Sequence, residues 1–352
     1  MAPKLDTPRD GQTDLPGPPE SADESQRRQL ADRLVKASDS ATARGQLRQR
    51  AEKLPCWHPS SPWNEDGSRR DPEKSLSAYE QPETSLSDAD YATHVKEVVE
   101  RLDQALAAGL ATNKLYAIDS DAEAWQEDRR AVHDEIIQRA YERAVDVPCE
   151  MKAIIIGGLA GAGKTTILEK HAGVDLSQYL IINPDNFKEE LAQRGLIPEV
   201  EGLSPMEAST LAHEESSHLA RQLAFRALAE GKNVIWDITM SSTTSAERRI
   251  QDLRSAGYDR VEGLFVDIPA ETSIARTQAR HRHGEDLFMG GIGPGGRFIV
   301  VEVTLSQFDS EFGTANRRAF ESLKDQFDYW ALYDNSVDSR PPILVDLGGI
   351  KQ

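Results

Sequence analysis

The segment from Lys152 to Thr166 constrains the fold most, because an apolar, β-rich run leads there into a glycine-rich turn and then a helical run. Its centre is Gly158-x-x-x-x-Gly163-Lys164-Thr165, a complete phosphate-loop pattern between a strand and a helix. The glycines let successive backbone N–H groups turn toward an anion, and the following helix directs its positive end at the same point. A glycine-rich turn that binds nothing is the alternative. The strand and helix around the motif favour a nucleoside triphosphate site.

The motif gives each of its polar residues a chemical role. Lys164 supplies a positive charge to the β- and γ-phosphates, and the hydroxyl of Thr165 is a ligand for Mg²⁺. The predicted nucleotide-binding residues are consecutive: Gly158, Leu159, Ala160, Gly161, Ala162, Gly163, Lys164, Thr165 and Thr166.

Composition narrows the range of partners. The 352 residues include 41 Lys and Arg against 59 Asp and Glu, a net charge of −18, and so acidic a surface repels nucleic-acid backbones. Cys56 and Cys149 are the only cysteines, and their unlike contexts indicate neither a disulfide framework nor a thiolate metal site. No long apolar run and no signal pattern at Met1 is present, which predicts a cytoplasmic chain without a membrane partner.

The chain is expected to have three parts. Residues 1–86 are rich in Pro, Ser and charged residues and are predicted to be largely disordered or linker, with a short charged helix from Ser21 to about Lys36. Within them, Pro-Cys-Trp-His-Pro is interpreted as a loop with a docking tryptophan and not as a metal pair. Residues 87–148 form a helical region, and residues 149–352 form the phosphate-loop domain.

Two amphipathic helices are predicted in the second part. The first begins near Ser87, has valines and leucines at helical spacing, and ends at Gly109 as its C′ residue. The second is expected to open at the capping box Ser120-Asp-Ala-Glu123, with Trp125 and Ile136 on its buried stripe.

Strand and helix patterns alternate through the third part. Beyond the phosphate loop, strands are predicted at 179–182, 233–237, 261–268 and 342–346, and helices are predicted to begin at Asn183, Ser204, Thr244 and Ala270. Such alternation predicts an α/β fold, a three-layer sandwich with a central parallel sheet, with the active site along the carboxyl ends of the strands.

Two aspartates fall at those carboxyl ends. Asp185 lies in the first turn of the helix that Asn183 caps, and it is expected either to accept the proton of an incoming hydroxyl or to act as a second helix cap. The positive helix end favours its ionised form. Asp237 closes an apolar strand at a Walker B-like position, where it would touch Mg²⁺ through water; a turn-forming aspartate is the alternative.

Basic residues supply the remaining charge. Arg297 ends the glycine-dense loop Gly290 to Gly296, which predicts a mobile lid that delivers one cation. Arg276 and Arg282 are expected on the solvated face of the preceding helix, and His281 and His283 are interpreted as surface residues.

The order of these segments resembles the zeta-toxin family of kinases over about residues 124–346. The segments that carry the resemblance are the phosphate loop, Asn183-Pro-Asp-Asn-Phe-Lys188, Asn233-Val-Ile-Trp-Asp-Ile-Thr239, Ala256-Gly-Tyr258, and Arg280 followed by Gly-Gly-Arg297. The resemblance implies a phosphate-loop kinase fold. It also implies ATP- and Mg²⁺-dependent phosphorylation of the 3′-hydroxyl of a UDP-N-acetyl amino sugar, which poisons cell-wall synthesis.

The resemblance also implies site residues. Asp185 matches the family's catalytic base and Lys164 its phosphate-loop lysine, while Arg280 and Arg297 match two phosphate-clamping arginines. Asp237 and Thr239 match an acid-x-threonine element beside the substrate.

One position departs from the family pattern. The best-known members carry a substrate-contacting glutamate on the long helix, and an ungapped alignment places Arg221 there. Glu214 or Glu215 is expected to take that role one or two turns earlier.

Several alternatives remain open. Related folds phosphorylate antibiotics, nucleosides or dinucleotides, and a regulatory ATPase that transfers nothing is a further possibility. No Asn-Lys-x-Asp motif marks a GTPase, and Asp237 is followed by Ile-Thr where an oligomeric ATPase carries a second acid. The family further implies a helical antitoxin that blocks the nucleotide site. The helices within 87–147 are a candidate restraint in cis, although a covering and folding role for them is favoured.

Overall fold

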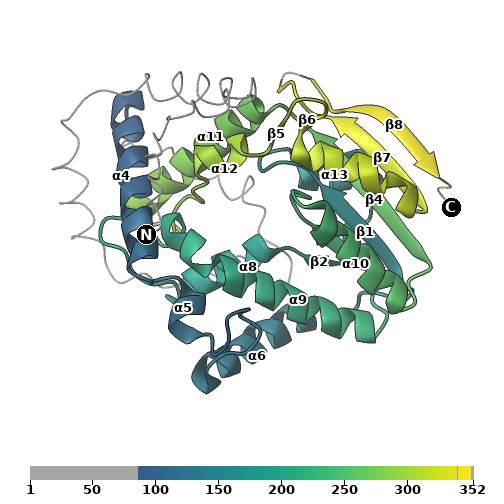
Figure 1. The fold of residues 1–352 in the computed structure, drawn as a ribbon, viewed down its shortest axis with the longest axis horizontal. Coiled ribbons are helices and arrows are strands. Elements are labelled where there is room, and N and C mark those ends of the chain that lie inside the picture. The colour runs from purple at the N-terminus through teal and green to yellow at the C-terminus, as the bar shows by residue number, and fades with distance from the viewer. Residues whose placement is uncertain (1–85, 339, 350–352) are drawn as a thin grey trace, which may run out of the picture.

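Six strands form the central sheet of the structure, a computed structural model that describes residues 86–338 and 340–349 (Figure 1). The predictions for Cys56, for His58 and for a helix at 21–36 lie outside the described residues. The strands are β1 (Lys152–Gly157), β2 (Leu180–Ile182), β3 (Val234–Asp237), β4 (Arg260–Asp267), β7 (Tyr329–Asp334) and β8 (Ile343–Gly349), and β5 (Phe308–Asp309) and β6 (Gly313–Thr314) form a small separate pair.

The helices are α4 (Asp88–Ala107), α5 (Thr112–Tyr116), α6 (Glu127–Glu142), α7 (Lys164–Lys170), α8 (Pro184–Gln193), α9 (His213–Ala229), α10 (Thr243–Ser255), α11 (Ala270–Met289), α12 (Val301–Leu305) and α13 (Ala315–Leu323), with short 3₁₀ turns η1 (Leu176–Gln178), η2 (Glu207–Ala212) and η3 (Lys324–Gln326). α4, α5 and α6 precede β1, and from β1 to β7 helices alternate with the strands of the sheet as expected.

The sheet confirms the predicted fold class and corrects its last strand. The strand order is β2-β3-β1-β4-β7-β8, and every pairing is parallel except that of β8 with β7. The prediction missed β7, because no Gly or Pro separates this strand from the preceding helix. The strand predicted at 342–346 is antiparallel, since the short connection from β7 has no room for the crossover that a parallel pair needs.

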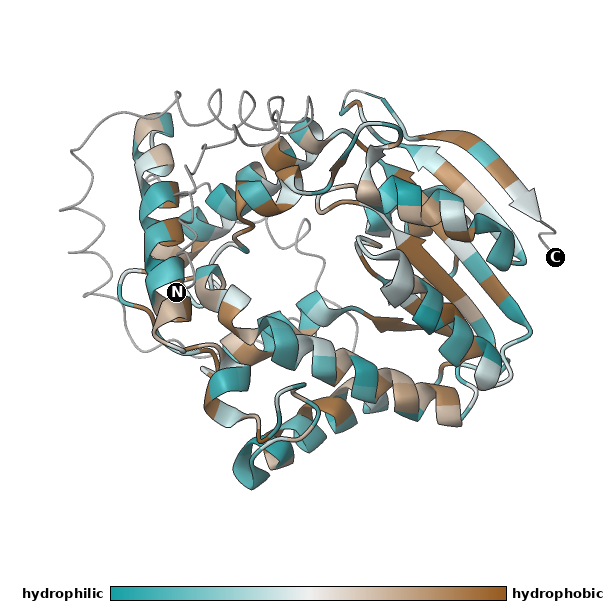
Figure 2. Ribbon diagram, in the orientation of Figure 1, coloured by the Kyte–Doolittle hydropathy of each residue, from teal (hydrophilic) through white to brown (hydrophobic). Residues whose placement is uncertain are grey.

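Both faces of the sheet are buried, and β1 shows the alternation. Ala153 and Ile155 face a core that includes residues of α8, α9, α10 and α13, whereas Ile154 and Ile156 face a second core with α7. Figure 2 shows hydrophobic residues, coloured brown, along the central strands. The phosphate loop therefore emerges from a strand held rigidly on both sides.

The second predicted helix lies inside the main core but begins later than expected. α6 packs on α9, and its Ile136 is only 2% exposed. Trp125 is buried as predicted, although it precedes the helix. The Asp119 carboxylate accepts from the amides of Glu123 and Ala124, so residues 119–124 form a turn and the predicted capping box does not open the helix.

The first predicted helix is confirmed as α4. The side chain of Ser87 accepts from the amide of Asp90, and Gly109 lies just beyond the last turn with φ 76°. α4 stands beside α11 and α12, at the opposite end of the molecule from β8 (Figure 1). Its Val98 and Leu102 form a separate small core with Phe298.

Other helix limits shift by a turn or less, except at α9 and α11. The Ser204–Glu207 capping box forms, but it opens the 3₁₀ turn η2, and α9 follows from His213. α10 is capped by Ser242 instead of Thr244, and α11 continues past His283 to Met289. None of the helices in the described ranges is long and apolar enough to cross a membrane.

Candidate active site

The phosphate loop joins β1 to α7 in a conformation that only glycine allows at its start. Gly158 has φ 142°, and a Cβ there would lie 2.4 Å from the carbonyl oxygen of Val266. Gly163 caps α7 with φ 83°. The strand, turn and helix predicted around the motif are all present.

Three side chains hold the carbonyls of the loop from outside. Ser273 Oγ donates to the carbonyl of Ala160 at 2.7 Å, and Asn335 Nδ2 donates to that of Ala162 at 2.8 Å. Arg276 Nη1 donates to the carbonyl of Gly161 at 3.1 Å. Carbonyls fixed in this direction leave the loop amides to face an anion. The solvated role predicted for Arg276 was therefore wrong, because the backbone group that it binds leaves no trace in the sequence.

Lys164 and Asp237 lie together beside the loop. Lys164 Nζ donates to the carbonyl of Gly158 at 3.2 Å and is 3.5 Å from Asp237 Oδ1. Asp237 Oδ2 accepts from Asn183 Nδ2 at 2.9 Å. Thr165, in the first turn of α7, is exposed. Mg²⁺ prefers oxygen ligands such as hydroxyls and carboxylates. The Thr165 hydroxyl and the Asp237 carboxylate, near the phosphate loop, therefore fit this ion.

Asp185 points its carboxylate at basic groups. The helix cap is Asn183, whose Oδ1 accepts from the Asp185 amide at 2.8 Å. Asp185 Oδ2 is 2.6 Å from Arg297 Nη1, and its Oδ1 is 3.5 Å from Lys188 Nζ. Sequence reasoning gave Lys188 no role, although its position three residues after Asp185 on one helix face was the available signal.

Four cations hold Asp185 in its ionised form. Burial by itself would raise the pKa of Asp185, but Arg297 and, after it, Lys188, Lys164 and Arg280 outweigh that effect and lower the pKa below its ordinary value. The carboxylate is therefore charged at neutral pH and can accept a proton.

The chain before Arg297 is packed closely against α11. A Cβ at Gly296 would lie 2.0 Å from the His281 carbonyl oxygen, and the Gly296 amide donates to Glu285 Oε1 at 2.7 Å. Arg297 also contacts Glu189, at 3.2 Å from Nη2 to Oε1. At this end of the loop glycine is needed for close approach, and mobility of the lid stays a prediction.

The two candidate glutamates of α9 are in opposite environments. Glu215 is fully buried, and its Oε1 lies 2.6 Å from both Arg129 Nε and His133 Nε2, which hold α6 against α9. Glu214 is exposed. Arg221 pairs with Glu123 at 2.9 Å. Of the two candidate glutamates, Glu214 is the one with an accessible carboxylate.

Thr239 follows β3 with an exposed side chain. Its carbonyl accepts from the Gly158 amide at 3.3 Å and from Asn316 Nδ2 at 2.7 Å. These contacts tie the residues after β3 to the start of the phosphate loop.

Two predictions for the end of α11 were wrong. His281, predicted on the surface, is 1% exposed and contacts Glu207 and Tyr91. Arg282 pairs with Asp88 of α4 at 2.6 Å. α4, from a distant part of the chain, covers His281, and it pairs with Arg282 while leaving the Arg282 side chain 30% exposed. His283 is exposed, as predicted.

The comparisons with known proteins agree with this geometry. A family model described as Zeta toxin matches residues 142–336, more than half of the chain. No curated protein matched the chain.

Solved structures of the AvrRxo1-ORF1:AvrRxo1-ORF2 complex share the fold at low sequence identity. A chain of the AvrRxo1-ORF1:AvrRxo1-ORF2 complex with sulphate ions has a TM-score of 0.52 at 19% identity, covering 67% of this chain and 76% of that one. The same complex with ATP has a TM-score of 0.50 at the same identity and coverage. The PezAT toxin-antitoxin system of Streptococcus pneumoniae has a TM-score of 0.44 at 18% identity, covering 64% and 83%.

Proposed function

The chain belongs to the zeta-toxin family, and we propose that it transfers the γ-phosphate of ATP to a hydroxyl group of a UDP-N-acetyl amino sugar. The carrying observation is the carboxylate of Asp185 beside the phosphate loop, with Arg297 at 2.6 Å and three further cations acting on it. In a chain with a net charge of −18, such a local excess of positive charge suits a site where phosphates meet an acceptor hydroxyl.

The residues divide the reaction among them. The loop amides and Lys164 hold the β- and γ-phosphates. The oxygen of the acceptor hydroxyl bonds to the γ-phosphorus, and Asp185 takes the proton of that hydroxyl. At the same time the bond from the γ-phosphorus to the β–γ bridging oxygen breaks, and ADP leaves. A carboxylate has about four lone-pair sites, so contacts to Arg297 and Lys188 leave room for this proton. Arg280 and Arg297 spread the charge of the transferring group.

Thr165 and Asp237 are the residues that would hold Mg²⁺. When bound, the ion neutralises charge on the β- and γ-phosphates. The presence of ATP in a structure of the AvrRxo1-ORF1:-ORF2 complex supports ATP as the donor here.

The acceptor is proposed to lie against Asp237, Thr239 and Glu214. The experiment is a panel of acceptors with labelled ATP and mass detection of the product. The panel contains UDP-N-acetylglucosamine, other nucleotide sugars, nucleosides, dinucleotides, aminoglycosides and a blank. Phosphate in the nucleotide sugar supports the proposal. Phosphate in another acceptor corrects the substrate, and equal turnover in the blank would identify an ATPase.

We further propose that the restraining partner is a separate antitoxin protein and not α4. α4 packs through Val98 and Leu102 onto Phe298, the residue after Arg297. A helix in that position supports the segment that carries the cation, so its removal should not release a blocked site.

A further inference from the structure

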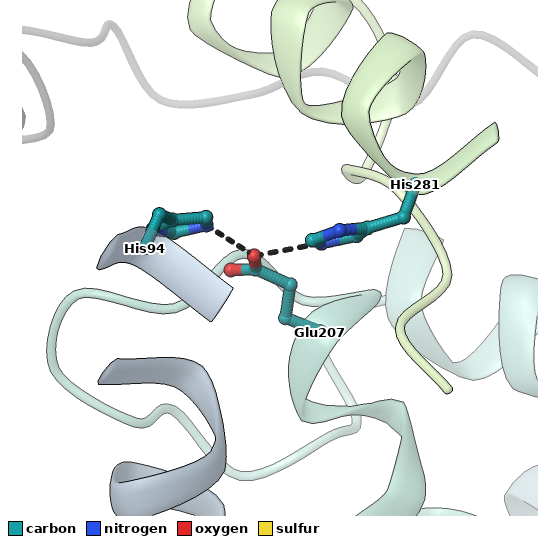
Figure 3. A group of neighbouring side chains, drawn as sticks. All are labelled: His94, Glu207 and His281. Atoms are coloured by element: carbon teal, nitrogen blue, oxygen red, sulfur yellow. Dashed lines mark hydrogen bonds and ion pairs between the residues drawn. The ribbon is translucent and has the colours of Figure 1, made fainter. Parts of the chain in front are cut away.

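A buried cluster of side chains lies outside the site described above. It consists of His94 in α4, Glu207 at the start of η2 and His281 in α11 (Figure 3). Within residues 86–338 and 340–349, it is the one group of three or more His, Cys, Asp or Glu side chains with ligand atoms close enough to share a metal ion. The three exposed fractions are 8%, 0% and 1%.

The ligand atoms of the three side chains converge. Figure 3 shows the two imidazoles on either side of the carboxylate, and Glu207 Oε1 lies 2.5 Å from His94 Nε2 and 2.9 Å from His281 Nε2. All three ligand atoms lie within 4.8 Å of one another. Around Zn²⁺ these N···O distances would widen by less than about 1 Å, because metal–ligand bonds of about 2.0–2.2 Å set them near 3.3 Å.

The hydrogen bonds around His281 call for a cation. The hydroxyl of Tyr91 is 2.8 Å from His281 Nδ1 and 3.1 Å from the Gln278 carbonyl oxygen. A carbonyl only accepts, so the Tyr91 proton goes to Gln278 and His281 Nδ1–H donates to Tyr91. A neutral His281 then has a bare lone pair on Nε2, facing a carboxylate oxygen. Either a proton, on the ring or on the carboxyl group, or a metal ion must lie between them.

Two further observations favour the metal ion. A ligating histidine usually donates its other ring N–H to a neighbouring oxygen, which is the arrangement of His281 and Tyr91. Glu207 is fully buried, and its ion-pair partners within the described residues are the imidazoles of His94 and His281. Negative charge in the interior is retained where a cation balances it.

We propose that His94, Glu207 and His281 form a binding site for a transition-metal ion of the Zn²⁺ class, which fastens α4 to the kinase domain. Two imidazoles and one carboxylate select such an ion over Mg²⁺ or Ca²⁺. The ring of His281 also contacts Phe298, at 5.1 Å between centroids, so the ion would fix the chain directly after Arg297. The site itself does not depend on the proposed kinase reaction.

The test measures metal content and affinity in the full chain. Protein stripped with EDTA is incubated with Zn²⁺, desalted and analysed by mass spectrometry of the metal, and its affinity is measured by competition with a chromophoric chelator. His94→Gln and His281→Gln keep a side chain that can hydrogen-bond Glu207 but remove a ligand nitrogen. His283→Gln, an exposed change on the same helix, is the matched control.

The expected result is one more Zn²⁺ per chain in the wild type and the control than in either ligand variant, with affinity falling about 10²-fold or more in the variants. Equal Zn²⁺ in wild type and ligand variants overturns the proposal and leaves a protonated histidine pair. If a variant does not fold, the wild type decides. Added Zn²⁺ must then raise its melting temperature, and Co²⁺ must give a visible absorption band that Zn²⁺ abolishes; the lack of either overturns the site.

Discussion

The phosphate-loop edge and the His94–Glu207–His281 cluster are built in different ways. At the phosphate-loop edge, Lys164 follows β1, Asp185 follows β2 and Asp237 ends β3, so neighbouring parallel strands bring these residues together. The cluster joins side chains that are 113 and 74 residues apart through helix packing alone. A sheet edge gathers side chains by rule, whereas a cluster between helices depends on how the whole chain packs.

The two regions also use charge differently. At the loop edge an ionised carboxylate is surrounded by cations and remains accessible, and Asp185 Oδ2 meets Arg297 at 2.6 Å. In the cluster the carboxylate of Glu207 is fully buried. Within the described part of the chain, its ion-pair partners are two imidazoles, those of His94 and His281. The first arrangement suits chemistry on phosphates, and the second suits the fastening of one element to another.

The largest effect is expected from Lys164→Ala. Within the described part of the chain, Lys164 Nζ contacts the Gly158 carbonyl and Asp237, both at the loop edge. Phosphoryl transfer should fall about 10³-fold or more with unchanged circular dichroism and melting temperature, because a lost charge on the phosphates matters most in the transition state. Lys170→Ala, exposed at the end of the same helix, is the control. Wild-type transfer by Lys164→Ala would show that the loop edge is not the site of reaction.

Asp185→Asn should come next. The change keeps the size of the side chain and the cap by Asn183 but removes the proton acceptor. Transfer should fall about 10²-fold or more while ATP still binds, measured by single-turnover assay and by calorimetric titration of ATP. The exposed change Glu199→Gln serves as the control. Intact turnover with a lower melting temperature would mean that Asp185 serves the helix and not the reaction.

The contrast between the regions also explains what the sequence could predict. The fold class, the phosphate loop and the Asn183 cap were predicted because each is written in consecutive residues or in a regular period. His281 was wrongly predicted to lie on the surface. The sequence pattern of a polar helix face is the same whether water or another helix covers that face. α4 covers His281 from 190 positions away, as the Tyr91 contact shows.

One strand and one side-chain contact were not predicted, for similar reasons. No Gly or Pro separates β7 from the preceding helix, and Arg276 binds the backbone carbonyl of Gly161, a contact that leaves no mark in the sequence. The capping-box sequence at Ser120 does not begin a helix. The Asp119 carboxylate accepts from the amides of Glu123 and Ala124 instead, and these residues form a turn.

Arg297→Ala should lower transfer by about 10²-fold and also change its pH dependence. Arg297 is the main cation that lowers the pKa of Asp185, so its loss raises that pKa and the acid limb of kcat/KM moves to higher pH. Lys188→Ala should move the limb less, in the same direction, because Lys188 ranks second. If the acid limb stays at the same pH in both variants, Asp185 is not the group whose ionisation sets it.

Leu102→Ala examines the small core that links α4 to the segment after Arg297. Leu102 is 2% exposed and packs with Phe298, so the free energy of unfolding should fall by about 2–3 kcal/mol. Leu106→Ala on the same helix, at a residue 43% exposed, should change it by less than about 0.5 kcal/mol. Urea denaturation gives both values.

The same core decides the role of α4. If α4 supports the segment after Arg297, both Leu102→Ala and deletion of residues 1–115 should lower transfer or leave it unchanged. If α4 is a restraint in cis, both should raise transfer, or toxicity in a host. A folded, ATP-binding truncated protein that is more active than the full chain would overturn the supporting role.

Glu285→Gln should change how the free energy of unfolding depends on pH, measured in EDTA-treated protein so that no metal ion alters the charge nearby. Burial, followed by the charge of Glu207, raises the pKa of Glu285 from 4.5 to about 8. Between these values the folded protein holds a proton that the unfolded chain has lost, so wild-type stability falls as pH rises, by up to about 1.4 kcal/mol per pH unit.

Glutamine removes this titration and keeps the oxygen that accepts from Ser204 and Gly296. The difference in the free energy of unfolding between Glu285→Gln and wild type should therefore grow in favour of the variant from pH 5 to pH 8, as measured by urea denaturation at one-unit steps. Glu271→Gln, exposed in the first turn of α11, should differ from wild type by a constant amount. Parallel curves for Glu285→Gln and wild type would mean that Glu285 is ionised in the fold, and that the region behind Arg297 carries more negative charge than its packing suggests.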